Sequence, residues 1–238
     1  MAGGPPILQV AQLDKRYGGV LAVRGVSFAL EEGSITGLIG PNGSGKTTVF
    51  NLITGTDRAD AGTVLLRGRR IEGLPPHRIA RLGIGRTFQL VRLFPGMTAL
   101  ENLLVAAVEE DGNGRREQAR DLLEEFGLAG LANEEAASLS FGQQKLLEFA
   151  RLLMSRHGLL LLDEPFAGVN PSTANVLVER IRRLQAMGMA VFIVDHEMRL
   201  IMDVCQTVMV LNHGELIAQG PPEEIRRDPR VNAVYFGR

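Results

Sequence analysis

The sequence predicts an α/β fold with a mostly parallel sheet, and three observations point to it. Short apolar runs at 159–162 and 190–194 flank an amphipathic stretch at 171–187, which is the β-α-β order of parallel strands joined by a right-handed crossover. A third short apolar run, at 33–40, leads through a glycine-rich loop into a helix. The composition agrees: 45% of the 238 residues are hydrophobic and 22% are charged, which is the balance of a globular domain.

The N-terminal third is predicted to contain further strands. Residues 7–35 hold short apolar runs separated by turn residues at 18–19 and 31–33, and 62–68 is another strand candidate. The proline pair at 75–76 favours a helix start, because proline fits the first helical position.

The middle of the chain is predicted to be helical. Leucine and alanine recur there at spacings of three and four from about 100 to 154. We therefore expect a single domain, 1–238, with a mostly helical insertion at about 90–155. Beyond it, after the strand at 190–194, the chain is predicted to end in a hairpin and a helix, at 208–211, 215–218 and from Pro221.

Charge and cysteine content narrow the classes of function. Lys and Arg number 26 against 27 Asp and Glu, so bulk charge predicts no nucleic-acid partner. The single cysteine, Cys205, allows no internal disulfide, which suits a reducing compartment. No apolar run approaches the roughly 20 residues of a spanning helix, and the N-terminus does not have the pattern of a signal peptide. We expect a cytoplasmic protein, or one held at a membrane only through a partner.

The strongest motif is the loop after the third apolar run, which fits the phosphate-loop pattern GxxxxGK[ST] between a strand and a helix. Its glycines let backbone N–H groups turn toward phosphate oxygens, and the helix N-terminus that follows favours an anion. Lys46 would reach the β- and γ-phosphates, and Thr47 would offer its hydroxyl to Mg²⁺. The predicted nucleotide-binding residues are Gly40, Pro41, Asn42, Gly43, Ser44, Gly45, Lys46, Thr47 and Thr48.

The apolar run at 159–162 ends in two acids, Asp163 and Glu164. Beside a phosphate loop, Asp163 would hold Mg²⁺ and Glu164 would act as general base on the attacking water. The alternative is that the two acids only cap the loop that follows the strand.

A third motif, Leu139-Ser140-Phe141-Gly142-Gln143-Gln144, resembles the LSGGQ signature of ATP-binding cassette (ABC) ATPases, with Phe141 in place of the first glycine. Alone, it could be a helix N-terminus with Ser140 as its cap.

Further residues follow the order of that family. Tyr17 resembles the aromatic residue that stacks on adenine, although it could be a half-buried turn tyrosine. Gln89 resembles the Q-loop glutamine that reaches Mg²⁺ and the attacking water, and His196 the switch histidine at the γ-phosphate. Asn170 takes the place of the usual D-loop aspartate and can supply a hydrogen bond but no charge.

The resemblance, which spans roughly 7–237, implies a P-loop NTPase core, an antiparallel β portion and a helical subdomain. It implies ATP and Mg²⁺ as cofactors and two cassettes that close head to tail, so that Ser140, Gly142 and Gln143 complete the partner's site. The catalytic residues implied are Glu164, His196, Lys46 and Gln89, and the metal-binding residues are Thr47, Gln89 and Asp163.

Within the family, segments such as Gly83–Phe94, Glu164–Pro171 and Val234–Gly237 are most similar to ATP-binding subunits of branched-chain amino acid importers. Related cassettes for urea or amide import, or for lipopolysaccharide export, are alternatives, and a soluble non-transport ABC ATPase is a more distant one. The implied partners are transmembrane permease subunits and a second cassette, identical or different, at the cytoplasmic face of the membrane. The apolar residues in the run at 90–95 would dock the permeases, or they would only pack the insertion onto the core; they are Leu90, Val91, Leu93, Phe94 and Pro95.

Overall fold

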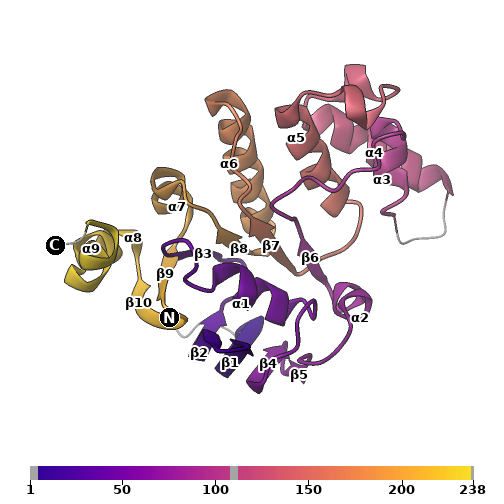
Figure 1. Cartoon of the computed structure of the whole chain (residues 1–238). Coiled ribbons are helices and arrows are strands. Elements are labelled where there is room, and N and C mark those ends of the chain that lie inside the picture. Colours follow the sequence, from indigo (N-terminus) through magenta and orange to yellow (C-terminus); the bar gives the residue numbers. More distant parts are fainter. Residues whose placement is uncertain (1–4, 108–111, 237–238) are drawn as a thin grey trace.

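The computed structural model describes residues 5–107 and 112–236, and this part of the chain contains a six-stranded and a four-stranded sheet (Figure 1). The strands of the larger sheet are β3 (Ile35–Ile39), β6 (Ile84–Arg86), β7 (Leu159–Asp163), β8 (Ala190–Val194), β9 (Thr207–Asn212) and β10 (Glu215–Gly220). Their order is β10-β9-β3-β8-β7-β6, with every pair from β9 to β6 parallel and the β9–β10 hairpin antiparallel. The predicted parallel sheet and late hairpin are thus confirmed.

The smaller sheet is antiparallel and is built mainly from the N-terminal strands. Its strands are β1 (Leu8–Tyr17), β2 (Val20–Leu30), β4 (Ala61–Leu66) and β5 (Arg69–Arg70). They lie in the order β2-β1-β4-β5, so the antiparallel β portion is confirmed as well.

Two apolar cores cover the two faces of the parallel sheet. Because side chains alternate along a strand, Leu159 and Leu161 of β7 join one core while Leu160 and Leu162 join the other. The first core lies between this sheet, the antiparallel sheet and α1 (Lys46–Ile53). The second lies under α6 (Pro171–Ala186) and α7 (Met198–Val204). The strands are therefore apolar on both faces, as buried parallel strands are.

The chain between β6 and β7 is mostly helical, within the segment 90–155 where an insertion was expected. It contains α3 (Ala99–Leu104), α4 (Gly112–Glu125), the 3₁₀ turns η1 (Ala129–Leu131) and η2 (Ala136–Ser138), and α5 (Phe141–Leu152). Leu147 and Phe149 of α5 share a core with α6, so these helices pack onto one side of the sheet (Figure 1).

The structure differs from the prediction at some short elements. The helix predicted at the proline pair is present as α2 (Pro76–Arg81), but β6 and α7 were not predicted. The end of the chain forms two helices, α8 (Pro222–Arg227) and α9 (Pro229–Phe236), where one was expected. Pro229 has no N–H to continue α8 and instead starts α9. Within the described residues no helix is long and apolar enough to cross a membrane.

Candidate functional site

The loop between β3 and α1 has the backbone that phosphate binding requires. Gly40 and Gly45 have φ angles of 156° and 106°. A Cβ atom on Gly40 would lie 2.1 Å from the Leu211 carbonyl oxygen, and one on Gly45 would lie 2.3 Å from that of Ala22. No side chain larger than hydrogen fits at either position without movement of the backbone, which accounts for both glycines.

The groups that line this loop suit an anion. No side chain of the described residues caps the N-terminus of α1, so its first N–H groups stay available to a ligand. The Ser44 hydroxyl is buried and has no hydrogen-bond partner among the described residues. An orphaned buried hydroxyl is costly unless a ligand or water completes it. Thr47 is exposed and Thr48 partly so.

Lys46 turns back over the loop. Its Nζ donates to the carbonyl oxygens of Gly40, at 2.8 Å, and Pro41, at 3.0 Å. Partial burial lowers the pKa of Lys46, while the carboxylates of Glu164 and Asp163 act in the opposite direction. The two carbonyls hold the ammonium group at the loop, where a phosphate oxygen would be a stronger, charged partner.

Four neighbouring parallel strands direct their carboxyl ends to one edge of the sheet. β3 enters the phosphate loop, β8 leads to His196, β7 ends at Asp163, and β6 leads to Gln89. Crevices outside the carboxyl ends of parallel strands are the usual ligand sites of α/β sheets. The structure therefore gathers residues that lie far apart in the sequence.

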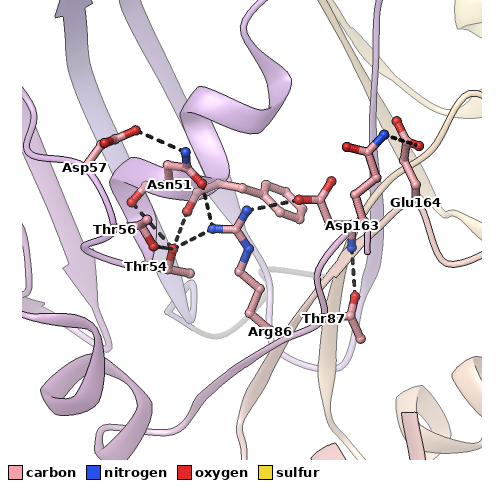
Figure 2. Close-up of polar contacts among 10 residues, drawn as sticks. Asn51, Thr54, Thr56, Asp57, Arg86, Thr87, Asp163 and Glu164 are labelled. Atoms are coloured by element: carbon pink, nitrogen blue, oxygen red, sulfur yellow. Dashed lines mark hydrogen bonds and ion pairs between the residues drawn. The ribbon is translucent and has the colours of Figure 1, made fainter. Parts of the chain in front are cut away.

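Glu164 has an unusual backbone at the centre of this edge. Its φ angle is 50°, a left-handed conformation that is uncommon for residues other than glycine and that clusters at functional sites. Its carboxylate accepts a hydrogen bond from Gln89 Nε2 at 3.1 Å (Figure 2). His196 Nδ1 lies 3.9 Å from Glu164 Oε2, and the histidine side chain is 59% exposed.

Arg86, at the end of β6, is a buried residue of the site that the sequence did not single out. Its guanidinium donates to Asp163 Oδ2 at 3.0 Å, and to Asn51 Oδ1 and Thr54 Oγ1 on and beside α1 (Figure 2). The Arg86 and Asp163 side chains are 8% and 5% exposed. Burial raises the pKa of Asp163, while the bond from Arg86 acts to lower it.

Asp195 is a second residue whose role the sequence did not reveal. Its carboxylate accepts from the backbone N–H of Phe166 and of Glu197, both at 2.9 Å. It thereby ties the loop after Glu164 to the turn that carries His196. Burial raises the pKa of Asp195, and the two backbone bonds act in the opposite direction.

The donor set fits a nucleotide-bound Mg²⁺ better than a metal held by protein alone. No group of three or more His, Cys, Asp or Glu side chains in the described part of the chain could hold an ion. Mg²⁺ is commonly held by one or two carboxylates together with substrate phosphates. Asp163 supplies the carboxylate, whose Oδ2 accepts the bond from Arg86.

Tyr17 lies at the end of β1 with its side chain 44% exposed. Its hydroxyl donates to Asp57 Oδ2 at 2.5 Å, and Lys15 Nζ lies 5.2 Å from the centre of its ring. Burial of the hydroxyl and the bond to Asp57 raise the pKa of Tyr17 to about 12. The ring is fixed at its hydroxyl end and open enough to stack.

The structure does not bring the signature residues to the phosphate loop of the same chain. They begin α5, which lies with α3 and α4, apart from α1 (Figure 1). Ser140 and Gln143 form a capping box, in which each side chain binds the backbone N–H of the other. The capping that was considered as an alternative for Ser140 is therefore present, and Gly142 packs beside Thr173.

The two departures from the expected motifs have local explanations. The Phe141 ring lies against Gly168, where an added Cβ would be 3.1 Å from Cε1. Asn170 is the N-cap of α6, because its Oδ1 accepts from the Thr173 N–H at 2.9 Å. An amide performs this capping as well as a carboxylate does.

Comparison with known proteins gives matches over nearly the whole chain. A family described as ABC transporter matches residues 23–167, and one described as branched-chain amino acid ATP-binding cassette transporter matches 215–238. The high-affinity branched-chain amino acid transport ATP-binding protein BraF of Pseudomonas aeruginosa is 43% identical, and its counterpart LivG of Escherichia coli is 42% identical, each over 98% of both chains. The lipopolysaccharide export system ATP-binding protein LptB of Haemophilus influenzae is 38% identical over 97% of both.

Solved structures of ATP-binding cassettes also resemble this chain. An ATP-binding cassette of an ABC transporter in its ADP conformation matches with a TM-score of 0.89 and 33% identity, over 99% of this chain and all of that one. A dimeric cassette in a post-hydrolysis state, bound to ADP and phosphate, matches with a TM-score of 0.82 and 26% identity, over 90% of this chain and 98% of that one. Both descriptions refer to nucleotide-binding cassettes, which is the fold predicted from the sequence.

Proposed function

We propose that this chain, which belongs to the ABC transporter family and is an ATPase that powers transport, drives the import of branched-chain amino acids. The observation that carries the solute class is full-length similarity to BraF and LivG, together with the family match at residues 215–238. We further propose one ATP-binding domain, 1–238, with a helical subdomain at about 90–155.

The phosphate loop is the proposed binding site for ATP. The backbone N–H groups of the loop from Asn42 to Thr48 and the uncapped start of α1 would surround the phosphates, whereas Pro41 has no N–H to donate. Lys46 would exchange its carbonyl partners for phosphate oxygens. Tyr17 would stack on the adenine ring, since aromatic side chains favour such offset contacts. Thr47, Gln89 and Asp163 would hold Mg²⁺, which neutralises phosphate charge when it is bound.

Glu164 is the proposed general base for hydrolysis. Its carboxylate would accept the proton of the water that attacks the γ-phosphorus, while Gln89 would orient that water. His196, on the neighbouring turn, would donate a hydrogen bond to the γ-phosphate. Lys46 would stabilise the charge that spreads over the transferred phosphoryl group.

A second cassette is the proposed partner that completes the site. Ser140, Gly142 and Gln143 lie at the start of α5, apart from the loop of their own chain. In a head-to-tail pair they would approach the partner's ATP, with the α5 N-terminus directed at the γ-phosphate. The similarity to a dimeric cassette bound to ADP and phosphate supports this arrangement.

Permease subunits are the other proposed partners, and they would hold the chain at the cytoplasmic face of the membrane. Leu90 is 80% exposed, and Phe94 and Pro95 are exposed beside it. Leu93 instead packs against the core that the helices cover, so the packing alternative holds for Leu93, and we assign the proposed docking to the exposed residues. The exposed members form an apolar surface suited to a coupling helix.

The test is to identify what co-purifies with the tagged chain from native membranes of its source, with the Lys46→Ala variant as a matched control. Two hydrophobic permeases and a branched-chain amino acid binding protein would support the proposal. Permeases of lipopolysaccharide export, or a urea or amide binding protein, would overturn the solute class. Recovery with ribosomes or DNA, without a membrane protein, would overturn the transport partners.

A further inference from the structure

The helix α5 carries two charged side chains that are buried. Lys145 and Glu148 are only 4% and 3% exposed, and at a spacing of three they lie on the same face of the helix. Neither belongs to the motifs that predicted the site. Because a buried charge is unfavourable unless it is paired or hydrogen-bonded, their partners indicate what these residues do.

Both side chains hold the backbone of the site. Lys145 Nζ donates to the carbonyl oxygen of Glu164 at 3.1 Å and, more weakly, to that of Gln89 at 3.4 Å. Glu148 Oε1 accepts from the backbone N–H of Arg92 at 2.9 Å. We call Lys145, Glu148 and these three backbone partners the clasp. The clasp fixes both ends of the segment 89–92 to the helix that begins at the signature.

The bond to Glu164 acts where the backbone is strained. Glu164 has a left-handed φ of 50°, which must be held by its surroundings to persist. Its N–H donates to the Val194 carbonyl at 2.7 Å, and its own carbonyl accepts from Lys145 and from the Ala167 N–H, at 3.1 and 3.3 Å. Lys145 is thus the charged donor that supports the peptide unit following Glu164.

The signature is linked to the same ammonium group. The Phe141 ring centre lies 5.8 Å from Lys145 Nζ, within reach of a cation–π contact, and the same ring packs against Gly168 in the loop after Glu164. The aromatic departure from the expected signature therefore belongs to the surroundings of the clasp.

We propose that Lys145 is a positioning residue for Glu164, and that the clasp transmits the position of α5 to Glu164 and Gln89. This proposal rests on the role of Glu164 proposed above. A movement of α5 would change the support of the Glu164 peptide and the position of Gln89 together. The direction of the Glu164 carboxylate, and with it the rate of hydrolysis, would follow. Among the described residues, none of the clasp's hydrogen bonds reaches the phosphate loop, so the affinity for ATP measured without Mg²⁺ would stay unchanged.

The test compares ATP hydrolysis and ATP binding in Lys145→Met and Lys145→Arg. Methionine keeps the length and apolar stem but donates no hydrogen bond, whereas arginine keeps the charge and the donors. Misplacement of a catalytic group by about an ångström costs on the order of 100-fold in rate. We expect kcat to fall about 10- to 100-fold in Lys145→Met, with unchanged affinity for a fluorescent ATP analogue measured without Mg²⁺ and a change in KM that is smaller than the change in kcat. Lys145→Arg should restore most of the turnover.

The matched control is Gln118→Met, which removes a hydrogen bond from α4 to the Leu153 carbonyl at the end of α5. It loosens the same helix away from the clasp and should leave kcat unchanged. Circular dichroism verifies that each variant is folded. If Lys145→Met does not fold, Lys145→Gln, which loses the charge and the reach, is measured in its place.

A double variant separates positioning of Glu164 from a general effect. If Lys145 acts through Glu164, adding Lys145→Met to Glu164→Gln should not lower the residual turnover further. An additive loss, a parental kcat in Lys145→Met, or an equal loss in Gln118→Met would each overturn the proposal. Parental turnover in Glu164→Gln itself would instead overturn the general-base assignment, so the two failures are distinguishable.

Discussion

Replacing Arg86 by methionine should destabilise the protein strongly. The Arg86 guanidinium donates three hydrogen bonds to Asn51, Thr54 and Asp163 (Figure 2), and the ion pair with Asp163 is almost fully buried. Methionine keeps the aliphatic stem near the rings of Phe50 and Phe88 but leaves the Asp163 carboxylate without its counter-charge.

The magnitude follows from burial. Breaking a buried ion pair by removing one partner costs about 3–5 kcal/mol, because the remaining charge stays uncompensated. In a chain of this length each kcal/mol lowers the midpoint of thermal unfolding by about 2–4 °C. We therefore expect a decrease of roughly 6–20 °C without nucleotide. Far-ultraviolet circular dichroism is the suitable assay, since the chain contains no tryptophan.

Two comparisons make this prediction refutable. Arg182→Met removes a surface ion pair whose side chains are 53% and 61% exposed, and it should cost about 0–1 kcal/mol. The double variant Arg86→Met/Asp163→Asn no longer carries the unpaired Asp163 carboxylate. Its loss in free energy of unfolding should therefore be smaller than the sum of the two single losses, by a coupling energy of about 0.5–3 kcal/mol. A loss in Arg86→Met no larger than that of Arg182→Met, or additive losses in the double variant, would refute the reasoning.

Four further predictions concern the site and the core. Glu164→Gln should bind ATP, accumulate as the ATP-bound dimer in size-exclusion chromatography and lose turnover, because the amide can still accept the bond from the Q-loop amide but cannot take a proton; parental turnover would contradict it. Lys46→Ala should lose ATP binding, and normal affinity by fluorescence titration would be inconsistent with the phosphate-loop assignment. Gly45→Ala should weaken ATP binding and cost about 1–3 kcal/mol of stability, because its Cβ would meet the Ala22 carbonyl at 2.3 Å; unchanged affinity and thermal midpoint would speak against this packing. Burial raises the pKa of the Cys205 thiol from 9.0 to about 12. Between these pH values the unfolded chain releases a proton that the folded chain keeps, so the free energy of unfolding should fall as pH rises from 9 to about 12. If a Cys205→Ala variant shows the same decrease, another group is responsible.

The elements that the sequence predicted are those specified by local patterns. Strands β7 and β8 are apolar runs bounded by turn residues. The phosphate loop is a contiguous motif in which Gly40 and Gly45 each meet a steric requirement. The strand β6 was missed because its three residues, Ile84–Arg86, are too few to show a period. The break between α8 and α9 was missed because Pro229 reads equally well as the end of one helix and the start of the next.

The parts of the site that escaped prediction depend on contacts between distant residues. From the sequence, an arginine after a short apolar segment is expected at the surface. Arg86 can be buried because it is paired with Asp163, which lies 77 positions later in the chain. Lys145 reads as the polar face of an amphipathic helix, yet its partners are two backbone carbonyls from other elements. Every residue has a backbone carbonyl whatever its side chain, so no sequence pattern could have indicated these bonds.

The signature illustrates why local and functional interpretations of a motif need not compete. The capping box of Ser140 and Gln143 accounts for both residue types within one chain. The Ser140 hydroxyl satisfies the N–H of Gln143, which leaves the N–H groups of Phe141 and Gly142 at the N-terminus of a 12-residue helix. Such groups favour an anion, and the phosphate loop of the same chain lies elsewhere in the fold (Figure 1). The cap thus leaves N–H groups at the start of α5 available to an anion, and a second cassette would bring a phosphate to them.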